Sequence, residues 1–438
     1  MTQRKVAVIG GGWAGLAAAV AATRAGHQVT LIEASRTWGG RARAISVTLP
    51  DGSDALLDNG QHILIGAYTD TLALMRTVGM DPRTSLLRTP LSMLFPDGEG
   101  IRLPDWPAPL DVVTGLLFAQ GWTWKDKLAL LRTTGRWQLA GFRCDASMSV
   151  AGLCQGLPAT VMHTLIEPLC VSALNTPPLR ASGQVFLRVL KDALLGGKGS
   201  SNLLIPTVNL GALLPDAAIV WLERHHANVR SGQRVQSIRR TTHWQVDSEA
   251  FDSVVLATHS SVACQLLDAS AIAIDSTSDS NISKWQNQAA ALQYEAIATV
   301  YVQADGARLA GPMLALHCDA ENPAQFVFDR GQCGGTAGLL AFVVSASEGD
   351  RAELQQKVLQ QAQRQLSHLI DVHALRSIQT IVEKRATFSC TPDLARPAPF
   401  IAPGLLACGD YVDGPYPATL EGAVRSGIAA AAAIGGSA

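Results

Sequence analysis

The sequence feature that most constrains the fold is a short apolar run that leads directly into three closely spaced glycines. Residues 6–9 are apolar, and Gly10, Gly12 and Gly15 follow before a helix-like stretch of small residues. A second apolar run then ends at Glu33. This order of strand, glycine turn, helix, strand and acid, within about 30 residues, predicts a dinucleotide-binding βαβ unit. The alternative is a glycine-rich turn in an ordinary α/β protein.

Each residue of this unit has a physical role in nucleotide binding. Gly10 permits the tight turn, Gly12 lets a pyrophosphate approach the backbone, and Gly15 lets the helix pack on the strand. The helix N-terminus offers free N–H groups and partial positive charge to phosphates. Glu33 accepts hydrogen bonds from ribose hydroxyls, and its charge disfavours a 2′-phosphate. The predicted cofactor contacts of the unit are Gly10, Gly12, Trp13, Ala14, Gly15, Glu33 and Ala34.

The composition limits the function classes and the compartment. The 438 residues include 35 basic and 36 acidic side chains, so the positive charge typical of nucleic-acid binding is missing. Hydrophobic residues make up 47% and charged residues 16%, which indicates a large apolar interior or an apolar substrate. We see no signal peptide, no transmembrane stretch and no C-x-x-C pair among the eight cysteines. We therefore expect a cytoplasmic protein with reduced thiols and no metal site.

Two further glycine motifs limit which nucleotide cofactor the chain can be expected to bind. Gly40 and Arg41 complete a Gly-Gly-Arg sequence just after the ribose-binding acid, and Arg41 can pair with a pyrophosphate. A surface loop with chance arginines is the alternative. Near the C-terminus, an apolar run ends at Gly409 and Asp410, and a loop and a helix-like stretch follow. Together with the first motif, these elements resemble the FAD-containing amine oxidase and phytoene desaturase superfamily.

The resemblance implies that FAD is the cofactor, and it implies roles for further residues. Asp410 would bind the ribityl and pyrophosphate part of FAD. The backbone at Thr419 and Leu420, where the last helix opens, would face the pyrimidine end of the flavin. Val235 would lie on a strand whose backbone meets the adenine. Beside the isoalloxazine ring, the resemblance places Gly60, Gln61 and His62.

Three stretches, 57–68, 167–178 and 383–388, look like the bacterial hydroxysqualene dehydroxylases, FAD-dependent enzymes of hopanoid biosynthesis. This resemblance implies reduction of the allylic C30 alcohol hydroxysqualene to squalene. Hydride from N5 of the reduced flavin would reach a cation-like carbon after loss of water. An external electron donor would reduce the flavin again, since no second glycine motif for NAD(P)H is visible. The candidate proton donors are His62, Tyr416 and Glu421, each of which can equally serve the structure.

Three other kinds of protein compete with this interpretation. A carotenoid (phytoene-type) desaturase shares the apolar substrate but runs in the oxidative direction. A flavin amine oxidase usually carries an aromatic residue at the position of Thr419, which counts against that activity. Prenyl-binding escort proteins share the fold without flavin, and the intact glycine motif, with Glu33 and Asp410, argues against them.

The order of patterns along the chain predicts an α/β fold with two interleaved parts. The first is a Rossmann-like FAD-binding domain of the GR2 type, assembled from residues 1–65, 203–270 and 395–438. The second is an α+β substrate-binding domain from residues 66–202, which are mostly helical, and 271–394. The latter range contains short β-rich runs typical of an antiparallel sheet and one amphipathic helix.

One apolar segment allows two interpretations. Residues 106–122 begin and end with tryptophan, and Lys125 and Lys127 follow closely. The segment either lies in a bilayer interface, where a peripheral contact admits a lipid substrate, or forms a buried helix with its entry loop.

Local patterns add expectations that a structure can test. Apolar spacings of three and four predict helices at 71–78, 124–140 and 185–195. Asn175, just before a proline pair, is expected to cap or turn the end of a helix. Strands are expected at 234–240, 339–345, 377–383 and 385–389, and 206–214 is expected to be a turn.

Overall fold

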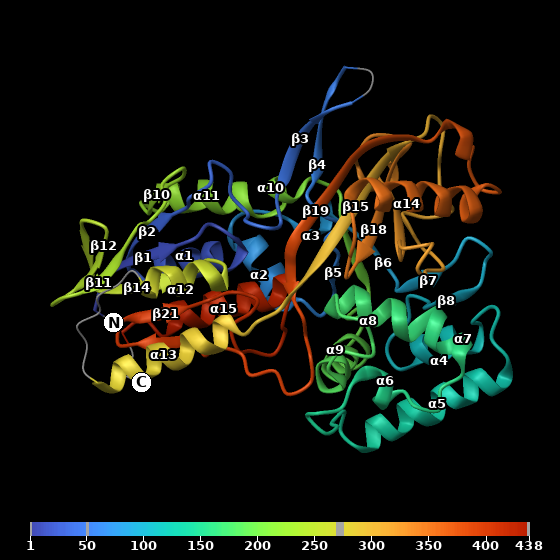
Figure 1. Ribbon diagram of the computed structural model, residues 1–438, viewed down its shortest axis with the longest axis horizontal. Helices are drawn as coiled ribbons and strands as arrows, with labels where there is room; N and C mark the ends of the chain where they lie inside the picture. The colour runs from blue at the N-terminus through green and yellow to red at the C-terminus, as the bar shows by residue number, and fades with distance from the viewer. Residues whose placement is uncertain (1, 50–51, 269–275, 436–438) are drawn as a thin grey trace.

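The protein is built on a six-stranded sheet, seen in a computed structural model that describes residues 2–49, 52–268 and 276–435. The strand order is β10-β2-β1-β14-β21-β20, and all neighbours are parallel except β20 and β21. The strands are β1 (Lys5–Ile9), β2 (Gln28–Ile32), β10 (Asn228–Arg230), β14 (Ser253–Leu256), β20 (Phe400–Ala402) and β21 (Leu405–Ala407). Three distant parts of the sequence therefore meet in one sheet (Figure 1).

Helices pack around this sheet and bring the two ends of the chain together. They are α1 (Trp13–Arg24), α10 (Leu210–Leu213), α11 (Pro215–Arg224), α12 (Ser260–Asp268), α13 (Ser276–Ala290) and α15 (Leu420–Ala432). Helices α1 and α15 touch at Gly427, where a Cβ would collide with the Ala14 carbonyl oxygen. A meander of β11 (Ile238–Arg240), β12 (Trp244–Val246) and β13 (Glu249–Phe251) extends this half.

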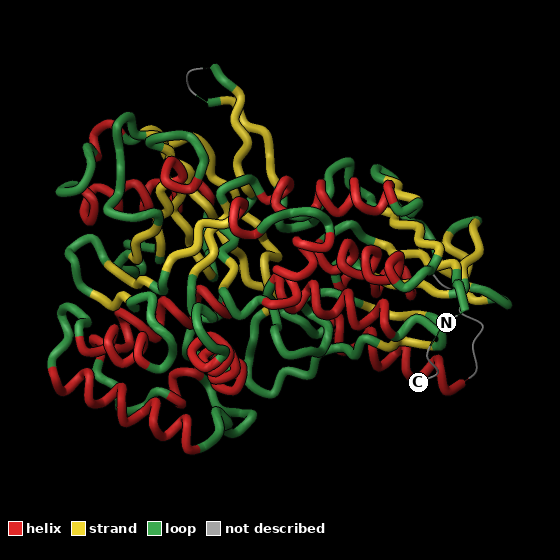
Figure 2. The backbone as a smooth tube through the Cα atoms, turned by 180° about the vertical axis from the view of Figure 1, so that it is seen from behind, coloured by secondary structure: helices red, strands yellow, loops and turns green. Residues whose placement is uncertain are grey.

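A second sheet, of five antiparallel strands, stands beside the first (Figure 2). Its order is β16-β17-β18-β15-β19. The strands are β15 (Tyr294–Gln303), β16 (Met313–Ala315), β17 (Phe326–Asp329), β18 (Leu339–Ser345) and β19 (Arg376–Phe388). Side chains alternate along β15. Val300 and Val302 join the apolar cluster under α14 (Arg351–Leu366), whereas Tyr301 joins the cluster on the opposite side of the sheet.

Most remaining residues form a helical part at the end of the molecule farthest from the termini (Figure 1). Its helices are α4 (Leu110–Leu117), α5 (Trp124–Leu139), α6 (Val150–Leu153), α7 (Ala159–Val161), the π-helical turn η1 (Met162–Ile166), α8 (Glu167–Leu174) and α9 (Gly183–Leu195). No helix in the described ranges is long and apolar enough to cross a bilayer.

Short elements connect these parts. They are the hairpin β3 (Ala44–Thr48) and β4 (Asp54–Asp58), β5 (Leu64–Ile65), α2 (Thr69–Thr77), α3 (Pro82–Ser85), β6 (Leu86–Thr89), β7 (Ser92–Leu94), β8 (Gly100–Arg102), β9 (Leu203–Pro206), and the 3-10 turns η2 (Arg330–Cys333) and η3 (Val372–Ala374). The hairpin projects from the top of the molecule in Figure 1. Strand β9 lies between β5 and β6.

The structure confirms the expected α/β class and most of the expected elements. The helices predicted at 71–78, 124–140 and 185–195 are α2, α5 and α9, and the strand at 339–345 is β18. Asn175 ends α8 in the left-handed conformation, with φ of 45°, as its position before two prolines indicated. The segment 106–122 contains α4.

Three local expectations were wrong. The strand expected at 234–240 contains only Ile238–Arg240, so Val235 lies in the loop before β11, because the preceding backbone is bonded to residues 33–35. The two strands expected at 377–389 are the single strand β19, since pairing with β15 continues across a register shift. The turn expected at 206–214 contains α10, whose first turn is capped by the Asn209 side chain.

The packing of α13 bears on where the two domains divide. This helix contacts α12 and β20, and the Trp285 indole donates a hydrogen bond to the Ala398 carbonyl at 2.8 Å. The division into two domains stays a proposal, and this contact moves the boundary proposed at residue 270 toward the end of α13.

Helix α15 is fixed to α2 by one buried carboxylate. Glu421 is fully buried and accepts hydrogen bonds from the Asp70 and Thr71 backbone N–H groups at 3.1 and 2.9 Å. The Thr71 hydroxyl and the Arg425 guanidinium donate to it as well, each at 2.7 Å. Glu421 therefore satisfies the open N-terminus of α2 from another part of the chain.

We predict that Glu421→Ala lowers the free energy of unfolding by about 3 kcal/mol, because it leaves buried N–H groups and Arg425 without their acceptor. A urea titration measures the change. Glu223→Ala, on the exposed side of α11, is the matched control and should change the free energy by less than about 0.5 kcal/mol. Equal effects of the two substitutions would contradict the capping role.

Candidate cofactor and active site

The glycine turn between β1 and α1 forms an open backbone cradle. A Cβ on Gly10 would lie 2.5 Å from the Ala257 carbonyl oxygen, and one on Gly15 would collide with the Gly10 carbonyl oxygen, so both sites require glycine. A Cβ on Gly12 would meet only Gly40, at 3.9 Å. Helix α1 begins without a capping side chain, so its first N–H groups remain available. This arrangement fits a pyrophosphate.

The side chains next to this cradle differ in what they offer. Trp13 is buried, and its indole donates a hydrogen bond to the Ala42 carbonyl at 3.3 Å, which holds the loop that contains the Gly-Gly-Arg sequence. Ala14 is buried against α15, and Ala34 is exposed. Trp13 and Ala14 therefore offer only their backbone to a nucleotide, whereas Ala34 is accessible as a whole.

Glu33 lies at the carboxyl end of β2, where a ribose is expected. Its carboxylate accepts hydrogen bonds from the Gly11 and Ser35 N–H groups at 2.6 and 2.7 Å. These bonds hold the carboxylate in place and leave lone pairs for a ligand hydroxyl. The Glu33 carbonyl also accepts a hydrogen bond from Gln233 at 2.9 Å, which brings the loop of Val235 to the same corner.

Arg41 and Asp410, from opposite ends of the sequence, form an ion pair. Asp410 is buried, and its charge raises the pKa of Arg41 although burial of the guanidinium opposes that shift. Arg41 also donates to the Ala386 carbonyl in β19 at 2.6 Å. The two residues expected at the phosphate and ribityl parts of FAD are thus brought together, beside the strand that ends the antiparallel sheet.

Two buried polar atoms near this pair lack a partner. Among the described residues, Nε2 of His259 and the hydroxyl of Tyr411 have no hydrogen bond. Burial, with Arg41 and Arg385 nearby, lowers the pKa of His259 to about 4, so its ring is neutral. Buried polar groups are normally paired. These open positions, with the glycine cradle, fit a large polar cofactor such as FAD. Sequence reasoning missed His259, whose only local signal is its place just after β14.

The segment after β4 connects the cofactor side to the antiparallel sheet. The Gln61 amide donates to the Tyr301 hydroxyl at 2.7 Å and accepts from Arg330 at 3.2 Å. Tyr301 donates to the Asp58 carbonyl at 2.7 Å. Burial raises the pKa of Asp58, although the Leu210 N–H and Arg330 work against that shift. Sequence reasoning missed Tyr301 and Arg330, since nothing in their local patterns joins them to residues 58–61.

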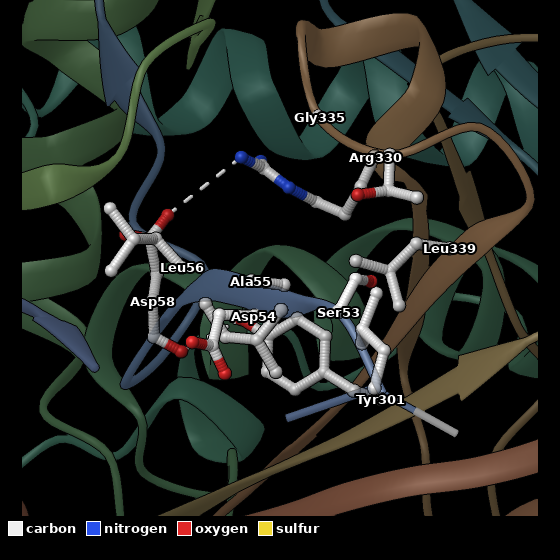
Figure 3. Close-up of a pocket in the computed structure, with 12 residues that line it drawn as sticks. Ser53, Asp54, Ala55, Leu56, Asp58, Tyr301, Arg330, Gly335 and Leu339 are labelled. Carbon is white, nitrogen blue, oxygen red and sulfur yellow. Dashed lines mark hydrogen bonds and ion pairs between the residues drawn. The ribbon is translucent and has the colours of Figure 1, made fainter. Parts of the chain in front are cut away.

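A cavity of about 240 Å³ lies against this network (Figure 3). Arg330 reaches across it toward Asp58, with 3.8 Å between nitrogen and oxygen. Apolar side chains line other parts of its wall, among them Leu56, Leu57 and Leu339. The cavity therefore combines a charged group with an apolar lining between the β3–β4 hairpin and the sheet.

His62 lies on the cofactor side of the same segment. Its Nδ1 donates to the Gly60 carbonyl at 3.1 Å. The protein packed around the ring lowers the pKa of His62, the bond to Gly60 opposes the shift, and the charge of Arg41 lowers it further. His62 is therefore neutral at pH 7, and it lies close enough to Arg41 for the guanidinium charge to affect its pKa.

The other two donor candidates have different surroundings. Burial, together with Asp192, raises the pKa of Tyr416 to about 12, and the Arg425 guanidinium lies 4.6 Å from its ring centre. The carboxylate of Glu421 is occupied by the end of α2, so it is poorly placed to deliver a proton. Thr419 caps α15 by accepting from the Gly422 N–H at 2.9 Å, and Leu420 is the first residue of that helix.

The stretches that carry the finer resemblance meet in space. The Asn175 amide donates to the Thr387 hydroxyl at 3.0 Å and accepts from the Ala346 N–H at 2.7 Å. Arg41, which acts on His62, donates to Ala386 in the same strand. Residues 167–178 and 383–388 are thus in contact, and Arg41, whose charge acts on His62 in the stretch 57–68, contacts the same strand.

We predict that Arg41→Ala raises the Kd for FAD by about 10-fold to 100-fold, because a charge-assisted hydrogen bond is lost. Titration of flavin fluorescence measures the affinity. The matched control is Arg36→Ala, an exposed arginine of the same loop, which should leave the Kd unchanged. If the two variants bind FAD equally, Arg41 does not contact the cofactor.

The fold has close structural relatives among oxidoreductases. An oxidoreductase from Methanosarcina mazei superposes with a TM-score of 0.70 at 16% identity, over 97% of this chain and 99% of that one. Cyclohexylamine oxidase from Brevibacterium oxydans superposes with a TM-score of 0.68 at 16% identity, over 99% and 98% of the two chains. These similarities establish the fold.

Sequence relatives extend over nearly the whole chain. Hydroxysqualene dehydroxylase from Sinorhizobium fredii is 26% identical over 98% of this chain and 97% of its own length. The protein of the same name from Zymomonas mobilis is 27% identical over 97% of both. Zeta-carotene desaturase from Synechocystis is 37% identical, but over only 17% of this chain and 14% of its own length.

A family model matches almost the whole chain. The model for flavin-containing amine oxidoreductases matches residues 13–435, which include α1, Arg41, Asp410, the antiparallel sheet and every strand of the parallel sheet except β1. The cofactor is accordingly FAD, and the protein is an FAD-dependent oxidoreductase. The chain belongs to the flavin-containing amine oxidoreductase family.

Proposed function

We propose that this protein is a hydroxysqualene dehydroxylase, which reduces the allylic alcohol hydroxysqualene to squalene. One observation carries the proposal. The three stretches that resemble bacterial hydroxysqualene dehydroxylases are far apart in sequence but are linked at β19: Asn175 bonds to Thr387, and Arg41, whose charge acts on His62, bonds to Ala386. Relatives of that name, matched over nearly their full length, support the same assignment.

The reaction needs a proton, a hydride and a dry cavity. Protonation of the hydroxyl lets it leave as water, and the allylic carbon, which then has cation character, accepts a hydride. Bound FAD in its reduced form supplies that hydride. The products are squalene, water and oxidised cofactor, and an external electron donor restores the reduced form. Apolar walls exclude the water that would recapture the carbon.

Among the residues of this chain, we assign the proton to His62. It is held by Gly60, faces Arg41 and lies in the segment that connects the cofactor side to the antiparallel sheet. Burial, and to a smaller extent the charge of Arg41, disfavours the charged ring, so the imidazolium is a stronger acid than a free one and gives its proton readily. Tyr416, with a pKa raised to about 12, is a weaker acid.

The competing oxidative functions have less support. The matched carotenoid enzymes cover 22% and 17% of this chain. For an amine oxidase, the position usually taken by an aromatic residue holds Thr419, whose side chain caps α15.

The direct test is anaerobic incubation of FAD-loaded protein with hydroxysqualene and a chemical reductant, followed by extraction and chromatography. Squalene should appear in proportion to the protein added. Parallel incubations with phytoene and with a primary amine, under air, should give no oxidised product. Oxidation of either compound, without squalene from hydroxysqualene, would replace the proposal with a desaturase or an amine oxidase.

The pH dependence tests His62. Since its pKa lies below 6.5, the charged fraction grows as the pH falls, and kcat/KM should rise as the pH is lowered through 6.5. His62→Gln should lower kcat/KM by about 100-fold or more and flatten this profile. His226→Asn, in an exposed turn, should keep the wild-type profile. If the pH dependence of kcat/KM is unchanged in His62→Gln, another group is the proton donor.

The proposal includes a peripheral contact between segment 106–122 and the membrane that holds apolar isoprenoids. The segment provides α4 and a tryptophan at each end. One of these, Trp106, is 52% exposed, whereas Trp122 is buried. Only part of the segment is therefore available for such a contact.

A further inference from the structure

Helices α4 and α5 carry an unusual amount of exposed apolar surface. The residue after α4, Phe118, and the first residue of α5, Trp124, are both 73% exposed. Side chains of this size normally lie inside a protein, and a gathered group of them marks an interaction site. We define the α4/α5 surface as the exposed residues Trp106, Leu110, Val113, Leu117, Phe118, Trp124, Leu128 and Leu131.

The spacing of these residues gives each helix an apolar outer stripe. On α4 they follow at intervals of three and four, and on α5 at four and three, so each set lies along one side of its helix. Other sides of the helices are already packed, through Leu116 in α4 and through Leu130 and Trp137 in α5. The exposed stripes are therefore additional to the contacts that hold the helices in the protein.

The two helices adjoin at a defined corner. The Lys127 ammonium donates to the Leu117 carbonyl at the end of α4, at 2.6 Å, and lies 5.3 Å from the centre of the Trp124 ring. Thr123 and Asp126 form a capping box that fixes the start of α5. The exposed ends of both stripes, Leu117 to Trp124, thus meet at a rigid turn.

The exposed charges between residues 102 and 143 are mostly positive, although the Glu99 carboxylate lies against Gly121 in the turn between the two helices. Basic residues that are exposed or partly exposed are Arg102, Lys125, Lys127, Arg132, Arg136 and Arg143. Of the acidic residues between positions 102 and 143, Asp111 and Asp126 are buried, and only Asp105 is exposed. The whole chain has a net charge of −1, so this positive charge is local.

We propose that the α4/α5 surface docks on an anionic lipid bilayer. The apolar stripes enter the boundary between headgroups and acyl chains, the two exposed tryptophans lie at headgroup level, and the basic side chains meet anionic headgroups. A second copy of this chain is disfavoured as the occupant, because a twofold interface would oppose like charges. This proposal rests on the proposed function: it names the type of membrane and adds α5 to the contact surface of segment 106–122. Vesicle binding can nevertheless be measured without turnover.

Co-sedimentation of FAD-loaded protein with vesicles tests the proposal. Partitioning should be stronger onto phosphatidylcholine mixed with phosphatidylglycerol than onto phosphatidylcholine alone, and added salt should weaken it. Phe118→Glu combined with Trp124→Glu should lower the partition coefficient at least about tenfold. Changing Lys125, Arg132 and Arg136 to Gln should lower it roughly fivefold for each charge removed.

The controls separate docking from folding and from activity. Val220→Glu replaces another exposed apolar side chain, on α11 in the other half of the molecule, and should bind vesicles like the wild type. Bound flavin should be unchanged in every variant. Equal partitioning of the Phe118/Trp124 variant and the wild type would overturn the proposal. The proposal would also be overturned if wild-type partitioning did not depend on anionic lipid and the wild type formed dimers that the Phe118/Trp124 variant does not form. If the wild type binds vesicles as predicted but forms no squalene from hydroxysqualene, the proposed function is refuted and the docking proposal stands.

Discussion

The ion pair between Arg41 and Asp410 joins the two ends of the sequence at the point where the cofactor and the antiparallel sheet meet. Arg41 follows the glycine motif of the first βαβ unit, and Asp410 follows the last strand of the parallel sheet. Asp410 is buried while Arg41 is partly exposed, so the carboxylate depends on the guanidinium for its partner. Because Arg41 also contacts β19 and acts on His62, one guanidinium relates the nucleotide-binding sheet, the substrate-side sheet and the candidate acid.

The contacts of helix α15 link the stability of the fold to the proposed function. Helix α15, which begins at Leu420 in the same C-terminal segment as Asp410, is held by Gly427 against α1 and by Glu421 against α2. These contacts fix the helix N-terminus that faces the flavin in the proposed arrangement. Glu421 therefore supports the site through the fold, whereas His62 and Arg41 lie within it.

Residues that act locally could be predicted from the sequence, and residues that act through distant contacts could not. Glycine turns, helix ends such as Asn175 and amphipathic helices depend on near neighbours, so their patterns identified the α/β fold and FAD as the cofactor. Arg330, Tyr301 and His259 gain their positions from pairing between strands far apart in sequence. For the same reason, Val235 was placed on a strand, although hydrogen bonds to residues 33–35 keep that segment in a loop.

The central claim is that reduction of an allylic alcohol takes place beside Arg41 and His62, and a single anaerobic turnover tests it most directly. The flavin of the holoprotein is first reduced, the reductant is removed, and hydroxysqualene is added while the visible absorbance is followed. The absorbance of oxidised flavin should return without oxygen, and one squalene should form for each flavin oxidised. A flavin that stays reduced until air is admitted, with hydroxysqualene recovered intact, would contradict the claim.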